Sequence, residues 1–124
     1  MKIREAVSEI KNLKPSQYSD EMLIAWLGEL DKSVWEDVLK AYGAPAPDLP
    51  YAKHMLEREL MIPSPHDRMY LTWLCAKIDL HNAEYERYNN QLMLYNAQHQ
   101  AFANYVTRNG LVADPAYVRG VKAL

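Results

Sequence analysis

The sequence predicts an all-α protein, a small helical bundle in which two shorter helices pack on one long C-terminal helix, with an irregular Pro-rich loop and an extended C-terminal tail. Apolar residues recur at helical spacing in three segments. Prolines gather between the second and third segments, and the third has no proline or glycine between Pro65 and Gly110. A chain of 124 residues that is 49% hydrophobic can form one domain with a core. We therefore expect a helical domain over residues 1–110 and a tail over residues 111–124.

The first two helices are recognised by their apolar spacing and by their ends. The first is expected over residues 2–13, because apolar residues at helical spacing run to Pro15; they are Ile3, Ala6, Val7, Ile10 and Leu13. Ser19 or Asp20 is expected to cap the second helix, which ends at Gly43. Its expected buried face comprises Met22, Leu23, Trp26, Leu27, Leu30, Val34, Trp35, Val38, Leu39 and Tyr42.

The stretch from residue 43 to residue 62 is expected to form an irregular loop or hairpin. Pro45, Pro47 and Pro50 impose extended backbone on the residues before them. Leu60 to Ile62 then read as an extended segment that leads into the third helix. The loop therefore separates the two short helices from the long one.

The third helix is predicted to be continuous. Ser64 as N-cap, Pro65 at the first helical position and Asp67 form a plausible capping box, and Asn109-Gly110 supplies the terminal left-handed turn. These ends predict a helix of roughly 40 residues, about 60 Å long. Such a helix is too long for the remaining chain to cover, so we expect it to finish its packing against other chains.

A heptad pattern and a gap in charge mark this helix. Its predicted seam comprises Leu71, Leu74, Ile78, His81, Tyr85, Tyr88, Leu92, Tyr95, His99, Phe102 and Val106. Residues 88–107 contain seven Asn or Gln residues and no Asp, Glu, Lys or Arg. Amides can satisfy one another between packed helices without the cost of burying an ion, so neighbours are expected on several sides. An intramolecular bundle with a polar surface is the alternative. So many amides exclude a membrane span.

This pattern predicts a subunit interface on the second half of the helix. The candidate interface residues are Tyr88, Asn89, Asn90, Leu92, Tyr95, Asn96, His99 and Phe102. The tail is rich in β-branched and aromatic residues for a disordered segment, and its candidate partner-binding residues are Leu111, Val112, Tyr117, Val118 and Val121. From composition alone, the tail either docks on its own chain or adds to a partner's sheet edge.

The sequence predicts no catalytic residue, no cofactor and no metal ion. It has no Gly-rich phosphate loop and no Ser-His or Cys-His arrangement. His81 and Glu84 share a helix face, but a metal centre in a bundle needs ligands from several helices. His81 and His99 are expected to hydrogen-bond within the seam, and Cys75 to be a buried thiol in a reducing compartment.

The charge balance argues against general nucleic-acid binding and against secretion. The formal net charge is −2 and the pI is near 6.1, so the basic excess that drives phosphate binding is missing. The first 15 residues carry charges every few positions and no apolar core of signal-peptide length. We therefore expect synthesis and assembly in the cytosol.

Several short motifs together resemble the head-tail connector proteins, also called adaptor or head-completion proteins, of long-tailed bacteriophages. The matching elements, in order, are Trp26 to Leu39, Glu59 to Pro63, Pro65 and Asp67, Ile78-Asp79, Glu84, Tyr88-Asn89-Asn90 and Tyr95-Asn96. His66 stands where that family usually has Tyr, and residues 44–58 match nothing in it. The resemblance covers the second predicted helix and the stretch from Glu59 to Tyr105.

The resemblance implies a structural virion protein without catalytic activity at the head-tail interface, assembled in the host cytoplasm. Such proteins form a ring, commonly of twelve subunits, that binds the portal protein and meets the next tail-side connector, stopper or tail protein. DNA passes through the channel without sequence-specific binding, and no membrane is involved. By resemblance, residues 111–124 would reach into the portal, and residues 44–62 would project toward the channel or the next ring. The alternative function is a helical interaction module outside the virion, such as an assembly chaperone or regulator.

Overall fold

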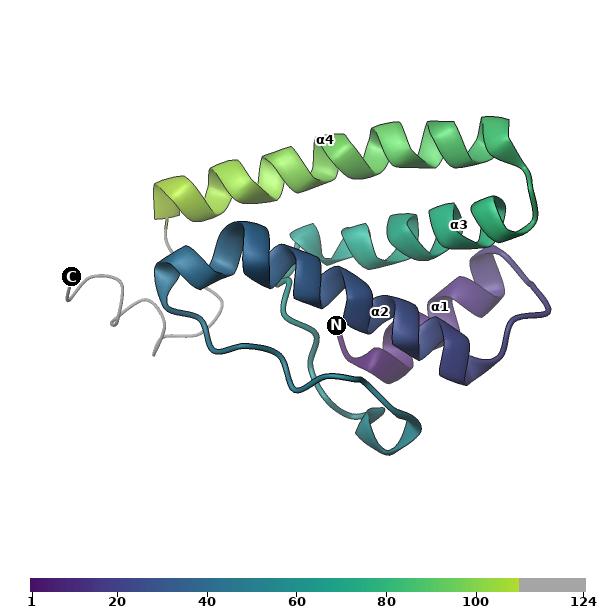
Figure 1. Cartoon of the computed structure of the whole chain (residues 1–124), viewed down its shortest axis with the longest axis horizontal. Helices are drawn as coiled ribbons and strands as arrows, with labels where there is room; N and C mark the ends of the chain where they lie inside the picture. The colour runs from purple at the N-terminus through teal and green to yellow at the C-terminus, as the bar shows by residue number, and fades with distance from the viewer. Residues whose placement is uncertain (110–124) are drawn as a thin grey trace.

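The computed structural model describes residues 1–109, and within that range the chain is helical with no β-strand. The α-helices are α1 (Ile3–Leu13), α2 (Asp20–Val34), α3 (Met69–His81) and α4 (Tyr85–Asn109). The long helix α4 lies along α3, with α1 and α2 on the other side of α3 (Figure 1). The prediction of an all-α protein with a long C-terminal helix against shorter ones is confirmed. Within residues 1–109 no helix combines the length and the apolar content needed to cross a bilayer.

The first two helices form where the sequence predicts them, but Met22, which is expected on the buried face of the second, is 42% exposed. Ile3, Ala6, Val7 and Ile10 are buried along α1, whereas Leu13 at its end is 60% exposed. The Ser19 hydroxyl accepts a hydrogen bond from the N–H of Met22 (3.2 Å), which is the expected N-cap of α2. After Val34 the same helical path continues as a π-helical turn, Trp35–Leu39, and a 3₁₀ turn, Lys40–Tyr42. It ends at Gly43, whose φ of 84° is accessible to glycine at little cost.

The prediction of one continuous helix from residue 63 to residue 110 is wrong. The chain reverses at Asn82, Ala83 and Glu84, so that α3 and α4 form an antiparallel pair (Figure 1). Ala83 adopts a left-handed φ of 59°, and the side chain of Asn82 accepts a hydrogen bond from the Tyr18 hydroxyl (2.7 Å). The reversal lets the apolar stripes of both helices cover each other, which a single straight helix could not do.

The predicted capping box at Ser64 is also wrong. The N–H of His66 donates to the carbonyl of Pro63 (2.9 Å), and a 3₁₀ turn, His66–Arg68, precedes α3. The carboxylate of Asp67 lies 3.6 Å from the α-amino group of Met1. Asp67 is therefore engaged in an ion pair with the start of α1 instead of capping a helix.

The core lies between α1, α2, α3 and the inner side of α4. Its largest fully buried side chains are Ile3, Ile10, Leu23, Ile24, Leu27, Leu30, Ile62, Met69, Tyr70, Leu74, Ile78 and Phe102. The indole N–H of Trp73 donates to the carbonyl of Trp26 (2.8 Å), so α3 is held against α2 by a polar contact at the edge of this core. The indole N–H of Trp35 donates to the carbonyl of Ala44 (2.8 Å), which fixes the beginning of the loop.

The loop over residues 43–62 is irregular, as expected, and is held to the domain by the buried carboxylate of Asp31. Oδ2 of Asp31 accepts hydrogen bonds from the Tyr51 hydroxyl (2.6 Å) and from the N–H of Met61 (3.2 Å). Oδ1 accepts from the Tyr70 hydroxyl (2.5 Å), which itself accepts from the N–H of Ile62 (2.7 Å). One side chain of α2 thus connects the middle of the loop and its C-terminal end to α3.

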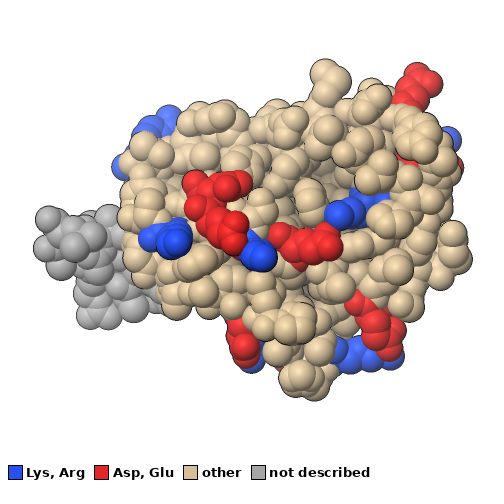
Figure 2. Space-filling view, viewed as in Figure 1, with Lys and Arg blue, Asp and Glu red and all other residues tan. Residues whose placement is uncertain are grey.

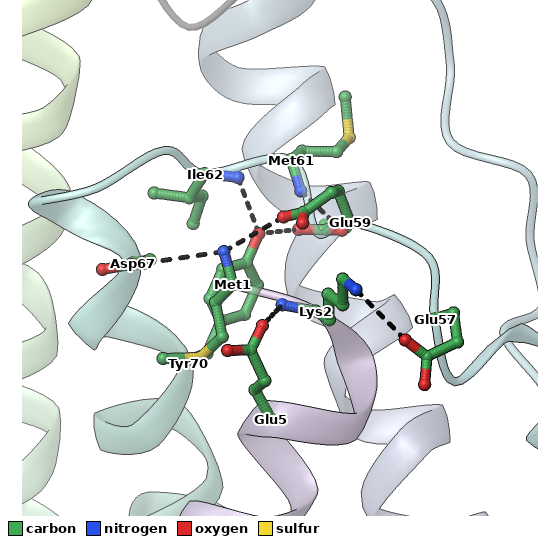
Figure 3. Close-up of polar contacts among 10 residues, drawn as sticks. Met1, Lys2, Glu5, Glu57, Glu59, Met61, Ile62, Asp67 and Tyr70 are labelled. Atoms are coloured by element: carbon green, nitrogen blue, oxygen red, sulfur yellow. Dashed lines mark hydrogen bonds and ion pairs between the residues drawn. The ribbon is translucent and has the colours of Figure 1, made fainter.

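The last part of the loop runs beside the start of α1. The N–H of Ile3 donates to the carbonyl of Arg58 (3.0 Å), and the N–H of Leu60 donates to the carbonyl of Met1 (2.9 Å). The α-amino group of Met1 also lies 3.2 Å from a carboxylate oxygen of Glu59 (Figure 3). Residues 58–62 are therefore part of the packed domain, while the 3₁₀ turn Lys53–Met55 lies at the far end of the loop.

We predict that Asp31→Ala lowers the free energy of unfolding by about 3 kcal/mol or more. The substitution leaves the hydroxyls of Tyr51 and Tyr70 and the N–H of Met61 without their acceptor, and each buried unpaired donor costs about 1–3 kcal/mol. Urea unfolding followed by circular dichroism measures this change. The matched control is Asp48→Ala, because Asp48 is exposed and pairs only at the surface with Arg58. Equal effects of the two substitutions would contradict the prediction.

A second prediction concerns how the stability of the fold changes with pH through the titration of Asp31. Burial raises the pKa of Asp31 above its ordinary value, against the hydrogen bonds from Tyr51, Tyr70 and Met61 that favour the carboxylate. The folded chain therefore binds this proton more tightly than the unfolded chain, whose Asp titrates near about 3.9. The resulting stabilisation is complete below the unfolded pKa and is lost as pH rises through the folded pKa.

The measurement is the difference in unfolding free energy between the wild type and Asp31→Asn as a function of pH. This difference should move in favour of the Asn variant as pH rises from about 3.9 toward neutral. The altered hydrogen bonding of Asn shifts the difference by the same amount at every pH. A constant difference would show that the hydrogen bonds balance burial, and a difference that moves in favour of the wild type would show that they outweigh it; either result would contradict the prediction.

Candidate subunit interface

The inner side of α4 belongs to the core of its own chain. Tyr95, Phe102 and Val106 are buried, Phe102 almost completely, against α3 and the π-helical turn. Burial raises the pKa of Tyr95 to about 12. The assignment of Tyr95 and Phe102 to a subunit interface is therefore corrected. Because the helix is broken at residue 82, the heptad seam meets α3 of the same chain.

The outer side of α4 is exposed and carries no charge over its central part. The exposed residues there are Asn89, Asn90, Met93, Leu94, Asn96, Ala97, Gln100, Ala101 and Asn104, which we call the outer face. Figure 2 shows the same gap, since charged side chains lie over the lower elements and near the ends of α4. The amide of Gln100 donates to the side-chain oxygen of Asn104 (2.9 Å), so two of these groups already pair with each other.

Two apolar side chains stand out on the outer face. Met93 is 72% exposed and Leu94 is 50% exposed, and both are flanked by amides and small residues. Sequence reasoning missed them because they fall outside the heptad positions. The signal that could have found them is the presence of large apolar residues at non-seam positions within the uncharged stretch. An uncharged, partly apolar helix face is typical of a surface that another molecule covers.

The other predicted interface residues divide into two groups. Asn89, Asn90 and Asn96 are exposed on the outer face. Tyr88, Leu92 and His99 are half-buried at its boundary with α3, and the His99 ring packs beside the Tyr95 ring with centroids 5.9 Å apart. The structure therefore keeps six of the eight residues accessible to a partner, at least in part.

A small apolar hollow of about 80 Å³ lies between α3 and α4. Its lining is mostly aromatic and aliphatic and consists of Trp73, Ala76, Lys77, Leu80, Tyr88, Leu92 and Tyr95. The one charged group in the lining, Lys77, pairs with Glu29 (2.8 Å) and lies over the Trp73 ring, 5.1 Å from its centroid. Leu80 is 37% exposed. The hollow thus presents an apolar surface next to a neutralised charge.

The polar side chains of α3 that could carry chemistry make contacts within the fold. Asp79 is fully buried, and Nζ of Lys14 lies 2.6 Å from its Oδ1, which ties the end of α1 to α3. His81 is exposed; its Nδ1 lies 2.9 Å from the Lys77 carbonyl. Cys75 is half-buried, and burial raises the pKa of its thiol. Among residues 1–109 no group of three or more His, Cys, Asp or Glu side chains is placed to hold a metal ion.

The ring of His66 makes aromatic contacts with α4. Its centroid lies 5.4 Å from that of the Phe102 ring and 4.9 Å from that of the Tyr105 ring. A planar ring at this position thus joins the turn before α3 to the C-terminal half of α4. The tail residues predicted to bind a partner, Leu111, Val112, Tyr117, Val118 and Val121, lie outside the residues that the structure describes.

No protein-family model, curated protein or solved structure matches this chain. The outer face of α4 and the hollow beside it are therefore the observations from which a function can be inferred.

We predict that Phe102→Ala lowers the free energy of unfolding by about 3–5 kcal/mol, because it removes a fully buried aromatic side chain from the core. Met93→Ala on the opposite side of the same helix is the matched control and should change stability little. Chemical denaturation of dilute protein measures both. A Phe102→Ala variant that keeps wild-type stability but no longer assembles would mean that the seam faces a neighbouring subunit.

Proposed function

We propose that this protein is a structural virion subunit that forms a ring at the head-tail interface of a bacteriophage, binds the portal and extends the DNA channel toward the tail. The observation that carries the proposal is the uncharged outer face of α4. Copies of the chain would meet through this face, and the family resemblance of the sequence supplies the biological setting.

The contrast between helices within the chain supports a covered outer face. The exposed side of the short helix α1 carries Arg4, Glu5 and Lys11, as a helix in water normally does. The outer face of α4 has amides, alanines and two large apolar side chains instead. Amides lose less on desolvation than ions do, so such a face can be buried against a neighbour at a smaller cost.

The arrangement of the subunit is compatible with a ring. The outer face and the far end of the loop at Lys53–Met55 lie on opposite sides of the molecule (Figure 1). A neighbour on α4 would therefore leave this end of the loop free for another component. The net charge of −2 also suits a channel component, because a wall that lets DNA slide should not neutralise its phosphates.

The alternative, a helical assembly chaperone or regulator outside the virion, is supported by one observation. The antiparallel pair of α3 and α4 completes the core within a single chain, so the subunit does not need a ring in order to fold. The two functions differ in where the protein is found. A connector is present in purified phage particles, and a chaperone is absent from them.

We predict that the purified protein, mixed with the portal protein of the same genome, forms rings visible by negative-stain electron microscopy. Met93→Lys should abolish the rings and leave the helical circular-dichroism spectrum unchanged, because it places a charge in the contact. The matched control is Met22→Lys on α2, where Met22 is 42% exposed and lies away from the outer face. A chain that stays monomeric at every concentration and ignores the portal would refute the proposal.

A further inference from the structure

The two flanks of α4 differ in shape. Successive residues of an α-helix are about 100° apart, so Leu92 and Leu94 differ by about 200° and point to nearly opposite sides of the helix. Leu92 faces α3 and lines the hollow. Leu94 projects on the other flank and is 50% exposed. One flank is therefore concave and the other bears a projecting apolar side chain.

The hollow suits one aliphatic side chain. Its volume of about 80 Å³ is that of a few methyl or methylene groups, and Trp73, Leu80 and Leu92 supply apolar walls. Lys77 at its edge is paired with Glu29, so an incoming apolar group meets no unpaired charge there. The exposed side chain of Leu80 lies on α3 within this lining, where a neighbour can reach it.

The residues around Leu94 are small enough for another surface to come close to α4. Ala97 and Ala101 follow it at helical spacing and are exposed, so the backbone of α4 can come near another surface. No charged residue lies between residues 88 and 107, so this stretch of α4 brings no charge of its own to a contact with the hollow.

We infer that neighbouring copies of this chain associate head to tail, with Leu94 of one copy seated in the hollow between α3 and α4 of the next. The inference rests on the proposed ring and specifies its contact. When a patch and a complementary pocket lie on different surfaces of one molecule, copies join through a repeating, heterologous contact. The chain of copies closes into a ring if the rotation from each copy to the next adds up to a full turn. A two-fold contact of Leu94 with Leu94 would leave both hollows empty.

Cross-linking of single-cysteine variants tests the contact. In a Cys75→Ala background, Leu94→Cys and Leu80→Cys are prepared separately and mixed with the portal protein, alone or together, before a short thiol-specific bis-maleimide is added. We expect covalent dimers only when the two variants are combined, and nothing larger, because each chain has one thiol. A chain with both cysteines should give a ladder of dimers, trimers and higher species.

A charge-based complementation covers the possibility that cysteine replacement disturbs the fold. Leu94→Lys and Leu80→Lys change exposed side chains, and each should reduce the assembled mass to that of the single 14.4 kDa chain. Mixed in equal amounts, they retain one intact contact, Leu94 of one variant with the hollow of the other. We expect a species of two chains and no larger one by native mass spectrometry.

The outcomes separate the two proposals. If electron microscopy shows rings but no cross-link forms between positions 94 and 80, the head-to-tail contact is overturned and the connector function still stands. A cross-link of Leu94→Cys with itself, or a failure of the two lysine variants to complement each other while the wild type assembles, would also overturn it. The absence of rings from the wild type with portal would refute the connector function and the contact together.

Discussion

The packing of α4 against α3 is the interaction on which the rest of the structure depends. Tyr95, Phe102 and Val106 cover the apolar side of α3, and full burial of an apolar side chain of this kind contributes about 1.5–3 kcal/mol. The same packing turns the amide-rich side of α4 outward and creates the hollow between the two helices. The core and the candidate interface are thus two sides of one helix, and a change on one side need not affect the other.

Asp31 has a comparable role on the opposite side of the core. A buried carboxylate is costly, and here the hydroxyls of Tyr51 and Tyr70 and the N–H of Met61 offset part of that cost. The network joins α2, the loop and α3, so an irregular segment with little regular hydrogen bonding is held in one arrangement. This gives the subunit a defined shape at the loop without additional secondary structure.

Because α3 and α4 complete the core within one chain, the chain does not need a neighbour to cover its apolar seam. The continuous helix predicted over residues 63–110 needed other chains to cover its apolar seam, whereas the folded hairpin covers most of that seam itself and leaves His81 and Tyr85 exposed. In the ring that we propose, contacts between copies would rest on the outer face, where the apolar area is modest. A contact of this kind is strengthened by repetition around a closed ring and by a common partner such as a portal, since each subunit is then held by several surfaces at once.

The sequence by itself determined the helical class, the bounds of α1, the Ser19 cap of α2, the turn at Gly43 and the uncharged stretch, because these depend on local spacing, capping and composition. Only the tertiary structure decided that the chain reverses at residues 82–84. That reversal has no glycine or proline to mark it and depends on contacts far apart in sequence, such as Tyr18 with Asn82. For the same reason, the sequence assigned Phe102 to an interface with another subunit, whereas the packing of α4 against α3 places it in the core of its own chain. A heptad pattern says which residues share a side of a helix, and only packing decides what that side meets.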